Sequence, residues 1–181
     1  MSASAVRSAV EPTRVEVRMP APEIVRKSAT LGLKVAAALA FLAPLATRIV
    51  VGLAFYQTGS GKLSNLDNVV AFFTELGIPF PGANAAFVST LELVGGIGLI
   101  LGLFTRLFAA GLASTMVVAL MTADKARFLE SWTAASEVSP TDISAFVFLL
   151  FFAWLALYGP GPLSLDKLLS KWLKIGTEPT Q

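Results

Sequence analysis

The 181-residue sequence contains no cysteine and no histidine, and only 14% of its residues are charged. Without cysteine the chain cannot form disulfides or hold an iron–sulfur cluster, and without histidine it lacks the commonest haem and metal ligand. We therefore expect no metal site and no intrinsic cofactor. Nucleic-acid-binding motifs are also absent. A redox role would depend on an electron carrier supplied from outside the chain.

Hydrophobic residues dominate what is present. They make up 55% of the sequence, and the mean hydropathy is +0.71, a composition typical of integral membrane proteins. A bilayer core requires about twenty apolar residues per helix. Segments of about this length span residues 33–57, 84–103, 107–123 and 141–158. The sequence thus predicts one transmembrane domain.

The predicted fold class is all-α, an integral membrane four-helix bundle over residues 33–160. Only Phe104, Thr105 and Arg106 separate the second and third segments, which indicates a tight antiparallel hairpin. Pro44 is expected to kink the first helix near its middle. We predict a disordered cytoplasmic extension over residues 1–32, where prolines alternate with charges, and an interfacial helix with a tail over residues 161–181.

Two shorter amphipathic helices are predicted outside the spanning segments. An outer one, capped at Ser64 or Asn65 and ended by Gly77 and Pro79, has apolar residues at helical spacing. These are Leu66, Val69, Val70, Phe73 and Leu76. The C-terminal one, capped by Ser164, has an apolar stripe of Leu165, Leu168, Leu169, Trp172 and Leu173. Its lysines lie beside the stripe, so we expect it to rest on an anionic cytoplasmic leaflet.

The distribution of lysine and arginine predicts the orientation in a cytoplasmic (inner) membrane. One side has ten: Arg7, Arg14, Arg18, Arg26, Lys27, Lys34, Arg106, Lys167, Lys171 and Lys174. The other side has only Lys62, Lys125 and Arg127. Because cytoplasmic loops are enriched in positive charge, both termini are predicted to face the cytoplasm.

Some polar and small residues have structural explanations. Small residues allow helices to pack closely in a membrane. We therefore predict a helix-packing role for the glycines of the second predicted helix, Gly95, Gly96, Gly98 and Gly102. Asp142 fits the first turn of a helix that is capped by Ser139 and has Pro140 at its first position.

Two charges, Arg48 and Glu92, lie inside apolar segments, where an ionisable residue is a functional-site hypothesis. Arg48 lies roughly 13 Å before the predicted outer end of the first helix at Gln57. Glu92 lies roughly 12 Å after the predicted outer end of the second helix at Asn84, so the two charges are predicted at the same depth. We predict that they form an ion pair. A structural role and a ligand or proton site carry equal weight for this pair. Gln57 and Lys62 are further candidates for ligand binding.

Several ordered motifs resemble the DoxX family of small four-helix membrane proteins. They are Arg48-Ile-Val-Val-Gly52, Gly59-Ser-Gly61-Lys62-Leu63, Gly77-Ile-Pro79, Glu92-Leu-Val-Gly95-Gly96, Leu101-Gly102-Leu103-Phe104-Thr105-Arg106 and Gly159-Pro160-Gly161-Pro162-Leu163-Ser164-Leu165-Asp166. The resemblance extends roughly from Thr47 to Leu169. It implies that Arg48, Lys62, Glu92 and Arg106 occupy the family's characteristic polar positions.

The resemblance also implies a function. Related proteins are described as membrane subunits of thiosulfate:quinone oxidoreductase or as membrane partners of oxidative-stress enzymes. Our leading hypothesis is a membrane subunit or anchor that supports quinone-linked redox chemistry. Its expected partner is a redox enzyme subunit, or further copies of the same chain in a homo-oligomer. Glu92 would exchange a proton, and Arg48 would stabilise the developing anion. The alternatives are a non-enzymatic scaffold of a larger complex and a carrier for a small molecule or lipid.

Overall fold

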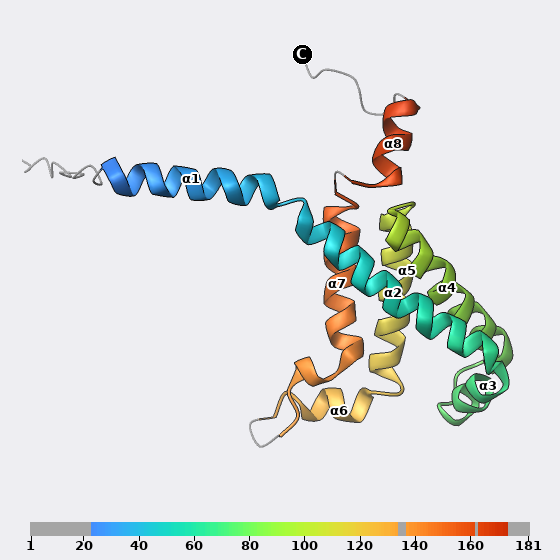
Figure 1. The fold of residues 1–181 in the computed structure, drawn as a ribbon. Coiled ribbons are helices and arrows are strands. Elements are labelled where there is room, and N and C mark those ends of the chain that lie inside the picture. The colour runs from blue at the N-terminus through green and yellow to red at the C-terminus, as the bar shows by residue number, and fades with distance from the viewer. Residues whose placement is uncertain (1–22, 134–136, 162, 174–181) are drawn as a thin grey trace, which may run out of the picture. The chain divides into compact units, whose positions relative to one another are not determined.

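The computed structural model describes residues 23–133, 137–161 and 163–173, and the secondary structure of these residues is helical, with no strand. The chain divides into two compact units, residues 1–38 and 39–181. Helix α1 runs over Glu23–Leu39, nearly all of it in the first unit, and an ion pair between Lys27 and Glu23 joins its first two turns. Figure 1 shows the course of the chain.

Helix α1 differs from the prediction for the N-terminal segment. It includes residues 23–32, for which disorder was predicted, because the last proline of this region, Pro22, lies before it and alanines and leucines follow. Residues 1–22 lie outside the described residues.

The second unit begins with helices α2 (Leu42–Ser64), α3 (Leu66–Glu75) and α4 (Pro81–Leu101). Helices α5 (Thr105–Met121), α6 (Lys125–Glu130) and α7 (Ser144–Tyr158) follow, with a single 3-10 turn, η1 (Pro140–Asp142), directly before α7. Helix α8 (Leu165–Trp172) comes last. The long helices pack in sequence, α2 on α4, α4 on α5, α5 on α7 and α7 against α2.

The first predicted segment is two helices rather than one kinked helix. A turn at Ala40 and Phe41 separates α1 from α2, and Pro44 lies in the first turn of α2. Proline has no backbone N–H, so it cannot continue the hydrogen bonding of a preceding helix but is tolerated in a first turn. Pro44 therefore permits a helix start here. At its other end α2 continues seven residues past Gln57, the predicted end.

The predicted amphipathic helices are present. Asn65 precedes α3, and Gly77 follows it with a φ of 69°. The Asn65 side chain does not cap α3, because it donates instead to the carbonyl of Gly61 in α2. Ser164 caps α8, accepting a hydrogen bond from the Lys167 amide at 3.3 Å.

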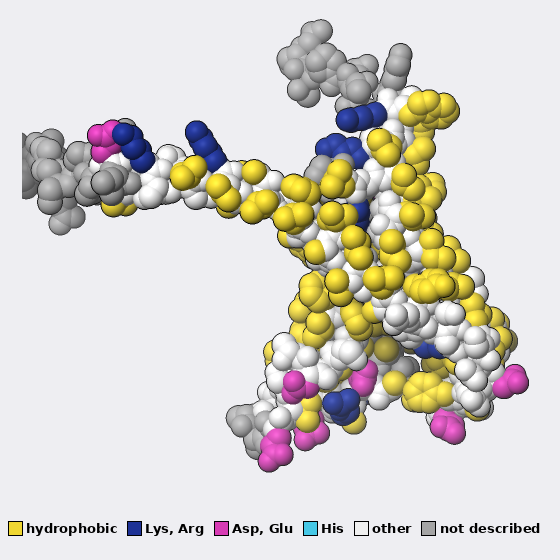
Figure 2. Space-filling view, viewed as in Figure 1, with side chains coloured by type: hydrophobic (Ala, Val, Ile, Leu, Met, Phe, Trp, Pro, Cys, Tyr) yellow, Lys and Arg dark blue, Asp and Glu magenta, His cyan; other side chains and the backbone are white. Residues whose placement is uncertain are grey.

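The interior of the second unit contains side chains from α2, α4, α5 and α7. Phe55 makes edge contacts with Phe148 and Phe152, at centroid distances of 5.1 and 4.8 Å. Leu99 and Leu112 are completely buried beside this cluster. The outward faces carry exposed apolar side chains such as Leu157, at 82% exposure, and these dominate the space-filling view in Figure 2.

Candidate functional site at Glu92 and Lys62

Glycines set the register between α2 and α4. A Cβ at Gly59 would clash with the backbone nitrogen of Leu93, and one at Gly96 would lie 2.5 Å from the backbone nitrogen of Tyr56. The two helix backbones therefore touch at these positions. Since the helices are antiparallel, this register brings the last turns of α2 level with Glu92.

The contact between α4 and α5 also depends on small residues. Gly95 faces the side chain of Leu112, and Gly98 faces the ring of Phe108. In this register Glu92 lies level with Thr115 of α5. Glu92 is thus positioned between α2 and α5, and its side chain is only 2% exposed.

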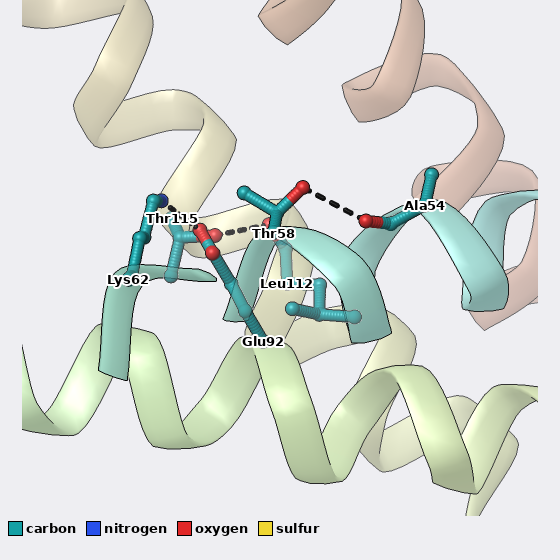
Figure 3. Close-up of polar contacts among 6 residues, drawn as sticks. All are labelled: Ala54, Thr58, Lys62, Glu92, Leu112 and Thr115. Atoms are coloured by element: carbon teal, nitrogen blue, oxygen red, sulfur yellow. Dashed lines mark hydrogen bonds and ion pairs between the residues drawn. The ribbon is translucent and has the colours of Figure 1, made fainter. Parts of the chain in front are cut away.

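The buried carboxylate of Glu92 pairs with Lys62. The Nζ of Lys62 lies 2.6 Å from Oε1 of Glu92, and the lysine side chain is 31% exposed. Figure 3 shows Lys62 reaching from the end of α2 toward the carboxylate. Because one partner is buried and the other reaches the surface, Lys62 connects Glu92 to the outside of the helix packing.

The predicted ion pair between Arg48 and Glu92 is wrong. The prediction measured depth from helix ends at Gln57 and Asn84. In the structure α2 continues to Ser64 and α4 begins at Pro81. From these true ends, Arg48 lies roughly 24 Å along its helix and Glu92 roughly 16 Å. The two residues are therefore on different levels, and the turn that carries Lys62 reaches Glu92 instead.

Arg48 binds the segment between α7 and α8, which contains Pro160 and Leu163 and is called the closing segment below. Its guanidinium donates hydrogen bonds to the carbonyl oxygens of Pro160 and Leu163, and the side chain is 1% exposed. Gly102 makes room for it, because a Cβ there would lie 2.6 Å from Nη1 of Arg48. Gly102 was predicted to pack within a helix. In the structure it follows the last residue of α4, with a φ of 67°. Arg48 thus holds the closing segment and has no contact with the Glu92 site.

The second oxygen of Glu92 has no hydrogen-bond partner. Oε2 is buried and unpaired. The nearby hydroxyls do not supply a donor, because Thr58 donates to the carbonyl of Ala54 and Thr115 to that of Leu112, each at 2.8 Å (Figure 3). One carboxylate oxygen is therefore fixed by Lys62 and the other can accept a hydrogen bond. Buried polar atoms without partners are rare in native proteins and call for an explanation.

A cavity of about 400 Å³ opens beside Lys62, between the end of α2 and α3. Gln57, predicted as a ligand-binding candidate, lines this cavity together with Lys62. The structure therefore places Gln57 and Lys62 on one cavity, pairs Lys62 with Glu92, and leaves Arg48 apart. The cavity falls within the size range of small-molecule sites.

The remaining predicted residues have structural surroundings. Arg106 lies near the end of α7, with Nη2 3.5 Å from the carbonyl oxygen of Leu157. Ser139 and Asp142 form a capping box on η1, in which the carboxylate of Asp142 accepts from the Ser139 amide at 2.8 Å. Among the described residues no three acidic side chains gather as they would around a metal ion.

Sequence reasoning missed the role of Asp166. Its carboxylate accepts hydrogen bonds from the amides of Phe104 and Thr105, at 2.7 and 2.9 Å, across the start of α5. The signal was available, since an acidic residue often satisfies the free amides of a helix N-terminus. It was hidden because the carboxylate comes from a segment about sixty residues away.

Comparison with known proteins identifies the family. The DoxX family model matches residues 43–125, which include Arg48, Lys62 and Glu92. The "Uncharacterized membrane protein Rv3486" of Mycobacterium tuberculosis is 34% identical over 133 residues, which cover 68% of this chain and 79% of that protein. The chain belongs to the DoxX family.

The matches to two further relatives of this DoxX protein cover most of the length of each relative. The "Putative oxidoreductase CatD" of Bacillus subtilis is 29% identical over 133 residues, 73% of this chain and 90% of that protein. The "Inner membrane protein YqjF" of Escherichia coli is 30% identical over 130 residues, 70% of this chain and 92% of that protein. No solved structure matches the chain at a significant level. The family and these relatives make it a membrane protein.

Proposed function

We propose that this DoxX protein is a membrane subunit that supports quinone-linked redox chemistry, with Glu92 and Lys62 as its proton-exchanging site. The observation that carries the proposal is the state of the Glu92 carboxylate. It is buried, one oxygen is paired with Lys62, and the other has no partner. An ionisable group held in this way inside apolar helices is a candidate for proton exchange. The name of the Bacillus subtilis relative is consistent with a redox role.

In this proposal α2, α4, α5 and α7 form a four-helix bundle in an inner membrane. Helix α4 is long and apolar enough to cross a bilayer, as is the stretch 27–64, which includes most of α1, the turn at Ala40 and Phe41 and all of α2. Helices α5 and α7 are shorter apolar helices. Acidic side chains gather around α6 and α3, and basic ones near α8 (Figure 2). With the basic end in the cytoplasm, both chain termini lie on that side.

The residues present fit a quinone headgroup. Lys62 lines the cavity and could donate a hydrogen bond to a ring carbonyl, whereas Glu92 is buried outside the cavity lining and would act through its pair with Lys62. Reduction to the quinol takes up two electrons and two protons. The electrons come from a partner redox enzyme, because the chain has no carrier of its own. Glu92 would supply protons by way of Lys62, which reaches the cavity, and Lys62 would stabilise negative charge on the ring oxygens.

Lys62 takes the role that the sequence assigned to Arg48. The Arg48 guanidinium is committed to the carbonyls of Pro160 and Leu163, away from Glu92. Lys62 is partly exposed, so it also gives protons a route to Glu92 from outside the bundle.

The decisive test replaces Glu92 with glutamine, which preserves shape and removes the exchangeable charge. Glu92→Gln is expected to lower quinone-coupled electron transfer in native membranes at least a hundredfold while the protein still elutes as a folded species. Glu75→Gln, an exposed position on α3, is the matched control and should retain full activity. Unchanged activity in Glu92→Gln would contradict the proposed role.

A scaffold function is the alternative that the structure favours next. Lys62 and Glu92 join α2 to α4, and Arg48 joins α2 to the closing segment, so both can fix helix register without chemistry. In that case Glu92→Gln would lower stability and assembly instead of activity alone. Purification of the protein from its native membrane in mild detergent, followed by native mass spectrometry, separates the cases. A stoichiometric redox enzyme is expected for the subunit, and a homo-oligomer with lipid alone would favour the scaffold.

A further inference from the structure

Helix α8 is joined to the rest of the described chain mainly through its first turn. The Asp166 amide donates to the carbonyl of Gly102 at 3.0 Å, and the Asp166 carboxylate accepts from the amides of Phe104 and Thr105. No residue of α8 is buried, and no other described helix packs on it extensively. The apolar face of α8 therefore lacks a partner within the described residues.

That apolar face adjoins a crevice at the end of α4. The crevice has a volume of about 300 Å³, and its walls are mostly apolar. It is lined by Leu101, Leu163, Ser164, Leu165 and Leu168. Leu168 is 63% exposed, and Trp172, one turn farther along the same stripe, is 80% exposed. Exposed apolar side chains that lie together in this way mark an interaction surface.

Positive charge lies along one edge of this apolar stripe. Lys167 and Lys171 are one turn apart, and at about 3.6 residues per turn both lie on the Leu168 side of α8. Both are exposed, and neither forms an ion pair with a described residue. Asp166, the acidic residue of α8, lies on the opposite edge, where the amides at the start of α5 bind its carboxylate. The edge of α8 beside the crevice is therefore cationic (Figure 2).

We propose that α8 and the end of α4 form a binding site for one anionic phospholipid. The lipid phosphate binds between the ammonium groups of Lys167 and Lys171, and one acyl chain lies in the crevice against Leu101 and Leu168. Lysine suits this position, because its stem covers apolar surface while its head reaches an anionic headgroup. The sequence predicts a place for α8 on an anionic leaflet, and the structure adds a slot for a lipid chain beside the charges.

The combination of charge and crevice selects an anionic lipid over other molecules. A soluble anion would pair with the lysines but leave the apolar crevice empty. A zwitterionic phospholipid would fill the crevice but bring a positive charge of its own to two lysines, and like charges brought together disfavour binding. The site is separate from the proton-exchange site, since Leu101 follows Glu92 by roughly 14 Å along α4. The inference therefore does not depend on the proposed function.

Trp172 provides a reporter for lipid bound on this face. The sequence has three tryptophans, so Trp132→Phe with Trp154→Phe leaves Trp172 as the single fluorophore. The full-length single-tryptophan protein, in a neutral detergent, is titrated with phosphatidylglycerol or phosphatidylcholine. Both lipids carry bromine at the same position of the acyl chain, and bromine quenches tryptophan fluorescence on contact. Because the chains are identical, their partitioning into micelles cancels when the two lipids are compared.

Two charge variants of the single-tryptophan protein test the role of the lysines. Lys167→Gln with Lys171→Gln removes both cations of the site. Lys125→Gln with Arg127→Gln is the matched control, because it removes the same charge from exposed positions of α6. All four replaced side chains are exposed, so both variants should fold.

Phosphatidylglycerol should quench Trp172 with a midpoint concentration at least tenfold lower than that of phosphatidylcholine. The Lys167 and Lys171 double variant should raise the phosphatidylglycerol midpoint at least tenfold and leave the phosphatidylcholine midpoint within twofold. The α6 double variant should change neither. Equal midpoints for the two lipids, or equal effects of the two double variants, would overturn the inference.

Soluble competitors separate the charge from the chain at constant ionic strength. Inorganic phosphate and glycerophosphoglycerol, which is the same headgroup without chains, should displace brominated phosphatidylglycerol at least a hundredfold less effectively than unlabelled phosphatidylglycerol does. If either soluble anion displaced the lipid as effectively as the intact phospholipid, the lysines would form an anion site only, and the lipid site would be overturned.

Discussion

Gly59 of α2 rests directly on the backbone of Leu93 in α4, at a separation that leaves no room for a side chain. The carbonyl of Ser89 lies on the same spot, 2.8 Å from where a Cβ would be. Because backbone atoms cannot rotate away as a flexible side chain can, any larger residue must push the helices apart. This contact sets the register that delivers Lys62 to Glu92.

Gly59→Ala should therefore weaken the packing of α2 on α4. We expect a loss of about 1–3 kcal/mol in the free energy of unfolding, as for other overpacked interiors. Gly61→Ala is the matched control, because a Cβ there meets nothing within 4 Å, and alanine also favours the helix over glycine. Thermal unfolding in detergent measures both. Equal stability of the two variants would show that the backbone contact does not limit packing.

Arg48→Ala should destabilise the contact between α2 and the segment that follows α7. It removes the donors to the carbonyls of Pro160 and Leu163, and a buried polar group left unsatisfied costs about 1–3 kcal/mol. The expected loss in free energy of unfolding is about 3 kcal/mol. Arg127→Ala is the control, since that side chain is 56% exposed and its pair with Asp124 is long, at 3.9 Å. A comparable loss in Arg127→Ala would contradict this assignment.

Arg48→Ala also separates two roles for the arginine. If Arg48 only holds the closing segment, quinone binding at the Lys62 cavity should persist in the folded fraction of the variant. Loss of binding in protein that remains folded would mean that Arg48 acts on the site itself. A benzoquinone without an isoprenoid chain provides this readout, because its ring would contact only the Lys62 cavity in the proposed function.

The helices were largely predictable from the sequence, and the central ion pair was not. The cores of α4, α5 and α7 were predictable because each is a long apolar run in the sequence. The end of α2 was misjudged because Gly59-Ser60-Gly61 has low helix propensity and looks like a loop. In the structure Gly59 is needed for contact with α4, so the helix continues and carries Lys62 to Glu92. Tertiary packing decided this boundary, and a single sequence does not reveal it.

Asp166 offers a test of how α8 joins the α4–α5 turn. Asp166→Ala removes the acceptor for the amides of Phe104 and Thr105, so it should cost about 1 kcal/mol, as the loss of a helix N-cap does. Hydrogen exchange at these two amides should accelerate. Lys167→Ala is the control, because its backbone bond to Ser164 survives the change. Unaltered exchange at Phe104 and Thr105 in Asp166→Ala would contradict the capping role.

The orientation in the membrane can be tested directly because the chain has no cysteine of its own. Two single-cysteine variants provide the labelling sites, Glu130→Cys at the end of α6 and Lys171→Cys in α8. Both side chains are exposed. With the basic α8 end in the cytoplasm, a membrane-impermeant maleimide should label Glu130→Cys in right-side-out spheroplasts and leave Lys171→Cys unlabelled. Both should react after permeabilisation, which controls for accessibility. Labelling of Lys171→Cys alone would invert the orientation, and it would place the Lys62 cavity on the cytoplasmic side, where a redox partner in the cytoplasm could reach it.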